Sequence, residues 1–232
     1  MTTPNKLLLA VLLTTAAISG ASAADLDFDY PAVIDMTASN QVDWSGFYAG
    51  VYAGYTGGRA TSTSVGNETP IDVKGGLLGG TVGVNAQYDK FVLGLENDLA
   101  WSGAEGSATC VGNAAFNCNG KLDWLGTTKL RAGVAFDQFM VFGTAGVALG
   151  GITATVDPVP GGITGSYSSA IWGWTAGAGA EMAVTDQVSV KAEYAYYDFA
   201  SVQAEAGTVT AAGATDIKSS AHVLKLGVNY RF

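Results

Sequence analysis

The chain has 232 residues, of which 48% are hydrophobic and 13% charged, and its formal net charge is −9. This composition excludes a disordered chain, and the scattered Lys and Arg residues exclude the basic surface that nucleic acid binding requires. The 32 Gly, 5 Trp, 10 Tyr and 9 Phe disfavour helices and suit short, tightly packed strands. We therefore expect one all-β domain with no nucleic-acid partner.

Residues 1–23 predict a cleavable signal peptide. Lys6 supplies the positive charge, Leu7–Ile18 the apolar segment and Ala21–Ala23 the cleavage site. The alternative, a membrane anchor, needs an apolar run of about 20 residues. Residues 24–45 carry several Asp residues without a sustained period and predict a flexible periplasmic spacer. The alternative there is a cation-binding segment, but the carboxylates lack the spacing of an EF-hand loop.

The barrel is predicted over residues 46–232, where runs of about ten residues alternate apolar with small or polar side chains. We count eight runs: Phe47–Tyr55, Leu78–Tyr88, Phe91–Trp101, Trp124–Phe136, Phe139–Leu149, Trp172–Met182, Val188–Phe199 and His222–Phe232. The fifth alternates least cleanly, because Met140 and Phe142 fall on its polar face. Strands of this kind, in even number, predict an eight-stranded antiparallel up-and-down transmembrane β-barrel.

The breaks between runs alternate in length. Residues 89–90, 137–138 and 184–187 predict short periplasmic turns, whereas residues 56–77, 102–123, 150–171 and 200–221 predict long outer loops. Aromatic residues at the run ends predict two membrane-interface belts. The periplasmic belt comprises Phe47, Tyr88, Phe91, Phe136, Phe139, Tyr230 and Phe232, and the outer belt comprises Tyr55, Trp101, Trp124, Trp172 and Tyr196.

Two other folds are weighed against this one. The uncharged residues 158–180 are long enough for a membrane helix, but Pro and Gly pairs interrupt them. A soluble lipocalin-like barrel would bury its apolar face, whereas here the other face contains the charges. Both are less consistent with the pattern than a transmembrane barrel.

Charges on the polar faces predict a packed lumen, because an eight-stranded barrel is just wide enough for side chains. Glu96 and Arg131 each lie six residues from a short turn, and Asp98 and Lys129 each lie about eight, so these pairs are expected to face each other. We expect a structural salt-bridge network, with catalytic or ion-conducting use as the alternative. Its members are Glu96, Asp98, Lys129, Arg131, Glu181, Lys191, Glu193 and Lys225.

Candidates for chemistry are few. Cys110 and Cys118 predict a disulfide in an exported chain, which would stabilise it by about 2–3 kcal/mol. The sole histidine, His222, follows Ser219 and Ser220. Some barrels that modify lipid A use a His paired with a Ser and a carboxylate for catalysis, but no nucleophile elbow is visible here. We predict no catalytic, cofactor or metal site.

Four motifs indicate a family: Trp44–Tyr55, Lys121–Trp124, Lys191–Asp198 and Gly227–Phe232. With them the chain resembles the alphaproteobacterial outer membrane immunogenic proteins, a porin-family group similar to the OmpA transmembrane domain. The resemblance implies a place in the outer membrane among its lipid and lipopolysaccharide, a role in envelope integrity, and surface loops that meet host or other ligands. It also implies that Tyr230 and Phe232 form the assembly signal read by the insertion machinery.

Some members of that family are reported to bind haem-like ligands, but the loops here hold no cluster that would ligate iron. No cofactor is therefore carried over. The resulting prediction is a structural outer-membrane barrel whose surface loops are antigenic and adhesive. The alternative is a low-conductance channel for small solutes, which the packed lumen disfavours.

Overall fold

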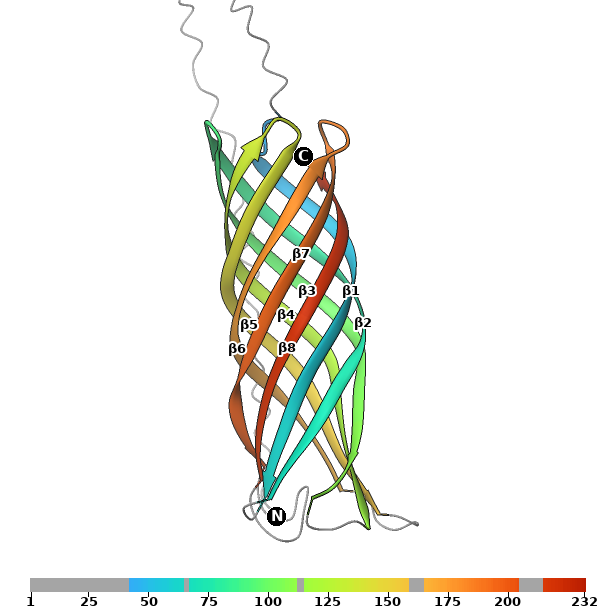
Figure 1. Ribbon diagram of the computed structural model, residues 1–232. Helices are drawn as coiled ribbons and strands as arrows, with labels where there is room; N and C mark the ends of the chain where they lie inside the picture. The colour runs from blue at the N-terminus through green and yellow to red at the C-terminus, as the bar shows by residue number, and fades with distance from the viewer. Residues whose placement is uncertain (1–41, 65–66, 112–114, 159–164, 205–214) are drawn as a thin grey trace, which may run out of the picture. The chain divides into compact units, whose positions relative to one another are not determined.

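The fold is a closed antiparallel barrel (Figure 1). The computed structural model describes residues 42–64, 67–111, 115–158, 165–204 and 215–232, so the predicted signal peptide lies outside the described residues. Eight strands occur within them: β1 Gly46–Ser64, β2 Asn67–Tyr88, β3 Phe91–Thr109, β4 Phe116–Phe136, β5 Phe139–Pro158, β6 Gly165–Ala183, β7 Val188–Ala204 and β8 Thr215–Arg231. The predicted eight-stranded all-β architecture is confirmed.

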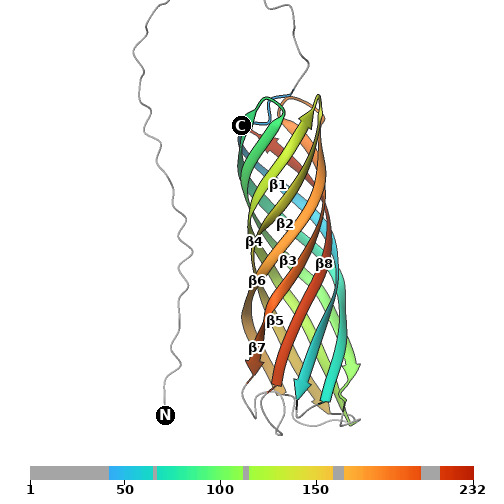
Figure 2. The same cartoon turned by 60° about the vertical axis from the view of Figure 1, so that its left-hand side comes forward.

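The last strand closes the ring by pairing with the first. Tyr48 lies opposite Arg231 and Val51 opposite Val228, and β8 pairs with β7 along its other edge. Figure 2 shows the strands tilted around the barrel wall. Closure gives the first and last strands a partner in each other, which β-structure in a lipid bilayer requires.

The helical alternative at residues 158–180 is replaced by β6. In the part of the chain that the structure describes, no helix has the length and apolar character needed to span a bilayer. The fifth run keeps the predicted register, because Met140 and Phe142 are buried and face the lumen.

We call the end of the barrel with the short connections the turn end and the opposite end the loop end. Asp89 and Asp137 begin the two-residue turns with φ of 53° and 51°. Asp tolerates this left-handed conformation better than most residues with a Cβ, and such turns suit the twist of a hairpin. The predicted short turns are therefore confirmed.

The predicted long outer loops are wrong, because most of their residues are strand. β1 continues to Ser64 and β2 begins at Asn67, so the segment expected to be a loop over 56–77 is almost entirely paired. The other three segments are shortened in the same way. β1 stays paired with β2 up to Ser64 and Asn67, and β4 with β5 up to Phe116 and Pro158, so these two ladders continue beyond the apolar belt and pair their backbone groups there.

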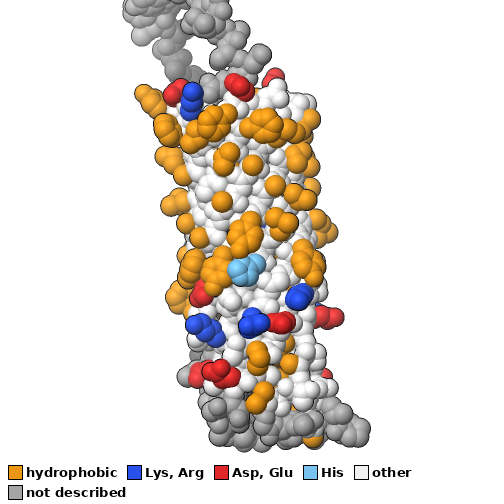
Figure 3. Space-filling model, viewed as in Figure 1, with side chains coloured by type: hydrophobic (Ala, Val, Ile, Leu, Met, Phe, Trp, Pro, Cys, Tyr) orange, Lys and Arg blue, Asp and Glu red, His pale blue; other side chains and the backbone are white. Residues whose placement is uncertain are grey.

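The polarity of the two faces of the wall inverts in these extensions, with apolar side chains inside and polar side chains outside. Ile71 and Val73 face the lumen while Asp72 and Lys74 face out, the opposite of the oily outer face nearer the turn end. Outward polar side chains are expected where the wall is surrounded by water rather than lipid. Figure 3 shows the change along one face: hydrophobic side chains cover the part nearer the turn end, and charged side chains gather toward the loop end.

A β-bulge between Leu122 and Trp124 makes the inversion possible in β4. Opposite β5, Leu122 pairs with Ile152 and Trp124 with Gly151, so Asp123 is the additional residue. One extra residue exchanges the inward and outward faces. Leu125 therefore faces the lumen on one side of the bulge and Leu122 on the other, and both are buried.

The two aromatic belts occupy the wall as predicted from the run ends. Phe47, Phe91 and Phe139 are exposed near the turn end, and Tyr55, Trp101 and Trp172 are exposed farther along. Trp174 and Tyr194 add to the second belt. Trp124 and Tyr196 are only partly exposed.

Candidate functional site

The lumen at mid-height holds a layer of ionised side chains, which we call the charge layer. Five strands, β3, β4, β6, β7 and β8, supply these charged groups. Along each strand they alternate with outward-facing residues, because every second residue of a strand faces inward. All eight side chains are buried: Glu96, Asp98, Glu181 and Glu193 with Lys129, Arg131, Lys191 and Lys225. Equal numbers of the two signs make their burial compatible with a stable fold.

Lys129 is the centre of this layer. Its Nζ lies 3.0 Å from Glu96 Oε1, 2.9 Å from Asp98 Oδ2 and 2.6 Å from Glu193 Oε1. Three carboxylates thus surround one ammonium group as ion-pair partners, and Glu193 Oε1 accepts a hydrogen bond from it. Oxygens of the same three carboxylates lie within 4.8 Å of one another, a spacing that could hold a metal ion. The Lys129 ammonium already supplies a positive charge among them.

Arg131 joins the charge layer to the turn end. Its guanidinium donates to Glu181 and lies 3.7 Å from Glu96 Oε2, with its Cζ 3.8 Å from the centre of the Phe142 ring. Glu181 also accepts hydrogen bonds from Ser189 and Asn229. A planar cation between carboxylates and an aromatic face is held by both charge and stacking.

Lys191 and Lys225 complete the layer. Lys191 Nζ lies 2.8 Å from Glu96 Oε2, and Lys225 Nζ lies 2.8 Å from Asp98 Oδ2. The Lys225 ammonium is also 5.1 Å from the centre of the Tyr52 ring and 5.8 Å from that of Tyr197. These contacts tie strands that are far apart in the sequence into one cross-lumen network.

The predicted ion pairs of Glu96 with Arg131 and of Asp98 with Lys129 both form, but the register between their strands is offset from the predicted one. Across β3 and β4, Glu96 lies opposite Lys129 and Gly94 opposite Arg131. Counting residues from the turns ignores the stagger that tilted strands acquire when a sheet closes into a barrel. The stagger moves β4 by two residues, since Phe91 pairs with Val134 rather than Phe136.

The Tyr48 ring fits against the charge layer because the residue opposite it on β2, Gly83, has no side chain. Its hydroxyl donates to Glu96 Oε2 at 2.7 Å. A Cβ at Gly83 on β2 would lie 2.4 Å from the Tyr48 ring, closer than a side chain allows. The neighbouring strand must therefore carry glycine for this hydrogen bond to form.

Toward the turn end the lumen is closed by apolar side chains, which we call the turn-end apolar layer: Trp44, Val92, Ala135, Met140 and Ala183. Trp44 is 1% exposed, and the Arg231 guanidinium lies 4.5 Å from the centre of its ring. Its backbone amide donates to Gln87 Oε1 at 2.8 Å. The flexible spacer predicted for residues 24–45 is therefore wrong for its last residues, because a large indole finds a matching apolar cavity in the barrel mouth.

Asp43 and Ser45 fix the chain on either side of that indole. The Ser45 backbone amide donates to Asp43 Oδ1 at 2.9 Å and holds the pKa of the Asp43 carboxyl below its ordinary value. Ser45 Oγ in turn accepts from the Gln87 amide at 3.0 Å. Residues 24–41 lie outside the described residues.

On the loop-end side of the charge layer the lumen is apolar again. We call this the loop-end apolar layer: Tyr52, Leu77, Ala100, Leu125, Ala148, Ile171, Ala195, Tyr197, Phe199, Ala221 and Val223. The Tyr197 and Phe199 rings stack with centres 6.3 Å apart. The charge layer thus lies between two apolar layers of the lumen.

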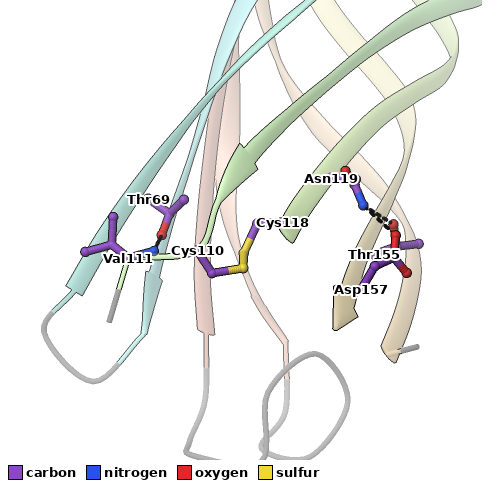
Figure 4. Close-up of a disulfide and its surroundings, with 7 residues drawn as sticks. All are labelled: Thr69, Cys110, Val111, Cys118, Asn119, Thr155 and Asp157. Carbon is purple, nitrogen blue, oxygen red and sulfur yellow. Dashed lines mark hydrogen bonds between the residues drawn. A yellow bond between two sulfur atoms is a disulfide. The ribbon is translucent and has the colours of Figure 1, made fainter. Parts of the chain in front are cut away.

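Cys110 and Cys118 form a disulfide at the loop end (Figure 4). It joins the end of β3 to β4 across eight residues of sequence. The Val111 amide next to it donates to Thr69 Oγ1 at 3.0 Å, which connects this hairpin to β2. The disulfide therefore holds together the loop end of the β3–β4 hairpin, and its role in this position is structural.

His222 lies on the outer face, away from the lumen charges. Its Nδ1 is 2.7 Å from the Tyr194 hydroxyl, and its ring packs against that of Tyr196 with centres 5.1 Å apart. The contacts recorded for this ring thus belong to the outer aromatic belt rather than to Ser219 or Ser220.

Comparison with known proteins agrees with this geometry. Residues 9–232 match the family described as outer membrane protein β-barrel domain. The chain belongs to this family. It is 31% identical to the 31 kDa outer-membrane immunogenic protein of Brucella melitensis, over 96% of this chain and 98% of that protein. It is also 30% identical to the 22 kDa outer membrane protein of Rhizobium leguminosarum bv. viciae, over 82% and 78%.

Among solved structures, OprG from Pseudomonas aeruginosa is similar with a TM-score of 0.54 and 13% identity, covering 81% of this chain and 96% of that one. This likeness concerns the fold alone. The family resemblance expected from the motifs is confirmed, and the protein is an outer-membrane β-barrel.

Several functional contacts were not predicted from the sequence. Trp44 was assigned to the start of a motif but not to the lumen, and Tyr48, Tyr52 and Phe142 were not connected with the charges. The signal for the last three was present, because each lies on the same inward-facing alternation as the ionised residues of its own or a neighbouring strand. For Trp44 the sequence contains no periodic signal, since it precedes the first strand.

Proposed function

We propose that this outer-membrane barrel is a structural component of the envelope that conducts no solutes. The observation that supports the proposal most directly is the charge layer, in which Lys129 joins carboxylates from β3 and β7 across the lumen. Opening a path there would require breaking paired, buried charges, which costs several kcal/mol. A barrel of this kind contributes to envelope integrity by filling the membrane with a rigid, closed wall.

The outer surface is proposed to act in recognition. The strands continue beyond the outer aromatic belt and carry polar side chains there, such as the Arg59 and Asp72 pair at 3.1 Å. Relatives from Brucella are named immunogenic outer-membrane proteins. The proposed role of this wall and its connecting loops is therefore that of an antigenic, adhesive surface.

Planar-bilayer recording tests the sealed lumen. Purified protein is expected to give no steady conductance above that of the bare bilayer, and proteoliposomes are expected not to swell in small sugars. A general porin reconstituted in the same lipid provides the positive control. Steady unit conductance that scales with the amount of folded protein would instead establish the small-solute channel.

The C-terminal residue is proposed to be an assembly signal for the insertion machinery. The Phe232 amide donates to the Phe47 carbonyl at 3.0 Å, but its side chain is 79% exposed. Its ring contacts Tyr230 edge-on, with centres 5.3 Å apart. Deleting Phe232 thus removes little packing, and we expect the amount of assembled protein in cells to fall at least several-fold while the unfolding free energy changes by less than about 1 kcal/mol.

Phe139→Ala is the matched control, since it removes an exposed aromatic from the same belt without altering the terminus. Membrane yield is measured by heat-modifiable migration on gels, and unfolding by urea titration in lipid vesicles. Equal yields for the wild type and the deletion would argue against a recognition role for this residue.

A further inference from the structure

The lumen contains a cavity of about 90 Å³ between the loop-end apolar layer and the loop end. Its lining includes six large apolar side chains from β2, β4, β5, β6 and β7: Ile71, Val73, Leu122, Ile152, Ile171 and Phe199. Thr56 and Ser219 contribute hydroxyl-bearing side chains. Neither the charge layer nor the proposed structural role explains an apolar cavity at this height.

This cavity lies in the part of the barrel that extends beyond the outer aromatic belt. Along β1 the belt residue is Tyr55, and the lining residues run from Thr56 to Ser62; along β4 the belt residue is Trp124, and Leu122 lines the cavity. The wall around it therefore has apolar side chains inside and polar side chains outside. Eight-stranded barrels with that polarity can hold one small ligand.

Water is a poor occupant of such a space. A buried water needs about 2–4 polar partners, and most of the lining offers none. A cavity of about 150 Å³ lined by Leu, Ile and Phe stays dry and binds benzene or xenon. The present cavity is of the same order and chemistry, so it favours compact, uncharged molecules.

On its turn-end side the cavity is closed. Phe199 and Ile171 belong both to its lining and to the loop-end apolar layer, and the charge layer follows. A molecule that enters could therefore not continue through the lumen. The geometry points to a binding site with one closed side rather than to a transport route.

We propose that this cavity binds one small, uncharged, apolar molecule of the size of a monocyclic hydrocarbon. Binding replaces an empty or poorly hydrated space by dispersion contacts with the lining side chains, and removes the ligand's apolar surface from water. Charged solutes are disfavoured because the lining provides no buried partner of opposite sign.

Methyl NMR in lipid nanodiscs tests the site with benzene as the probe. Ile71, Ile152, Ile171 and Ile217 all line the cavity, so labelling isoleucine δ1 methyls places four reporters in it. We expect these resonances to shift with benzene and to reach saturation, because the site holds one molecule. Shifts that rise linearly without saturation would show partition into lipid only and would overturn the proposal.

Gly120→Leu is designed to fill the cavity. A Cβ at Gly120 would lie 3.6 Å from Val73 Cγ2 and 3.9 Å from Ile71 Cγ2, in ordinary contact, so the longer side chain extends into the space. Apparent affinity for benzene is expected to fall at least tenfold. Gly120→Ala, which adds only the Cβ, is expected to weaken binding less and keeps the test valid if the Leu variant does not fold.

Gly57→Leu is the matched control on the outward face of β1, where an added Cβ would meet nothing within 4 Å. It should bind benzene as the wild type does. Unchanged binding in folded Gly120→Leu, or equally large saturable shifts of the same methyls with glucose, would contradict the proposal.

Discussion

Replacing Lys129 with Met is expected to lower the free energy of unfolding by about 3–5 kcal/mol, the cost of removing one partner from a buried ion pair. The effect should lie at the upper end, because Lys129 Nζ contacts Glu96, Asp98 and Glu193 at 2.6–3.0 Å. Met preserves most of the volume but leaves three carboxylates to repel one another in a low-dielectric lumen. Urea titration of vesicle-folded protein, followed by tryptophan fluorescence, measures the change.

Lys121→Met is the control for this variant. Lys121 also pairs with a carboxylate, Asp123 at 3.4 Å, but its side chain is 52% exposed. Water and salt screen that pair, so its loss should cost less than about 1 kcal/mol. If the two substitutions had similar effects, the buried ion pairs of Lys129 would contribute no more to stability than an exposed pair does.

Trp44→Ala is expected to destabilise the barrel by about 3–5 kcal/mol, as large-to-small substitutions of buried aromatics do. The indole is 1% exposed and packs against Val92, Met140 and Ala183 in the turn-end apolar layer, with Arg231 over its face. Removing it leaves a cavity in the mouth and deprives the guanidinium of its aromatic contact. The same urea titration measures the loss through the remaining tryptophans.

Trp44→Phe should recover a large part of that stability, because it retains an aromatic ring for Met140 and Arg231 to contact. The loss of unfolding free energy in Trp44→Phe is expected to be smaller than that in Trp44→Ala by at least about 1 kcal/mol. Equal unfolding midpoints for the wild type and Trp44→Ala would mean that the residues before β1 do not contribute to the folded barrel.

The transmembrane part of the fold could be predicted because the bilayer imposes a simple rule on each strand. Val51 and Leu226 must face lipid while Tyr52 and Lys225 face the lumen, and this alternation is visible in the sequence. The identity of the buried charges followed from the same rule. The predicted ion pairs Asp98–Lys129 and Glu96–Arg131 also form. The register between β3 and β4 was not predicted, since it depends on the tilt and stagger of the closed barrel rather than on distance along one strand.

The strand extensions at the loop end were not predicted because their polarity is the reverse of that in the membrane, with apolar side chains inward and polar side chains outward. Asp72 and Lys74 face outward with Ile71 and Val73 inward, so a search for oily outer faces finds none. The bulge at Asp123 further breaks the period within β4. Trp44 was missed for a different reason: packing of a residue outside any strand depends on the shape of the cavity that receives it.

The inverted wall has a consequence for the rate at which the barrel can form. With the turn end in the periplasm, as the alternating turn lengths predict, the outward charges of the extensions must cross the hydrocarbon core during insertion; they include Arg59, Lys74 and Glu105. Charged side chains at the bilayer centre cost about 2.5–3.5 kcal/mol each on insertion scales. Unassisted insertion is therefore expected to have a high kinetic barrier, so that the final state is stable but reached slowly without a catalyst that thins or opens the membrane.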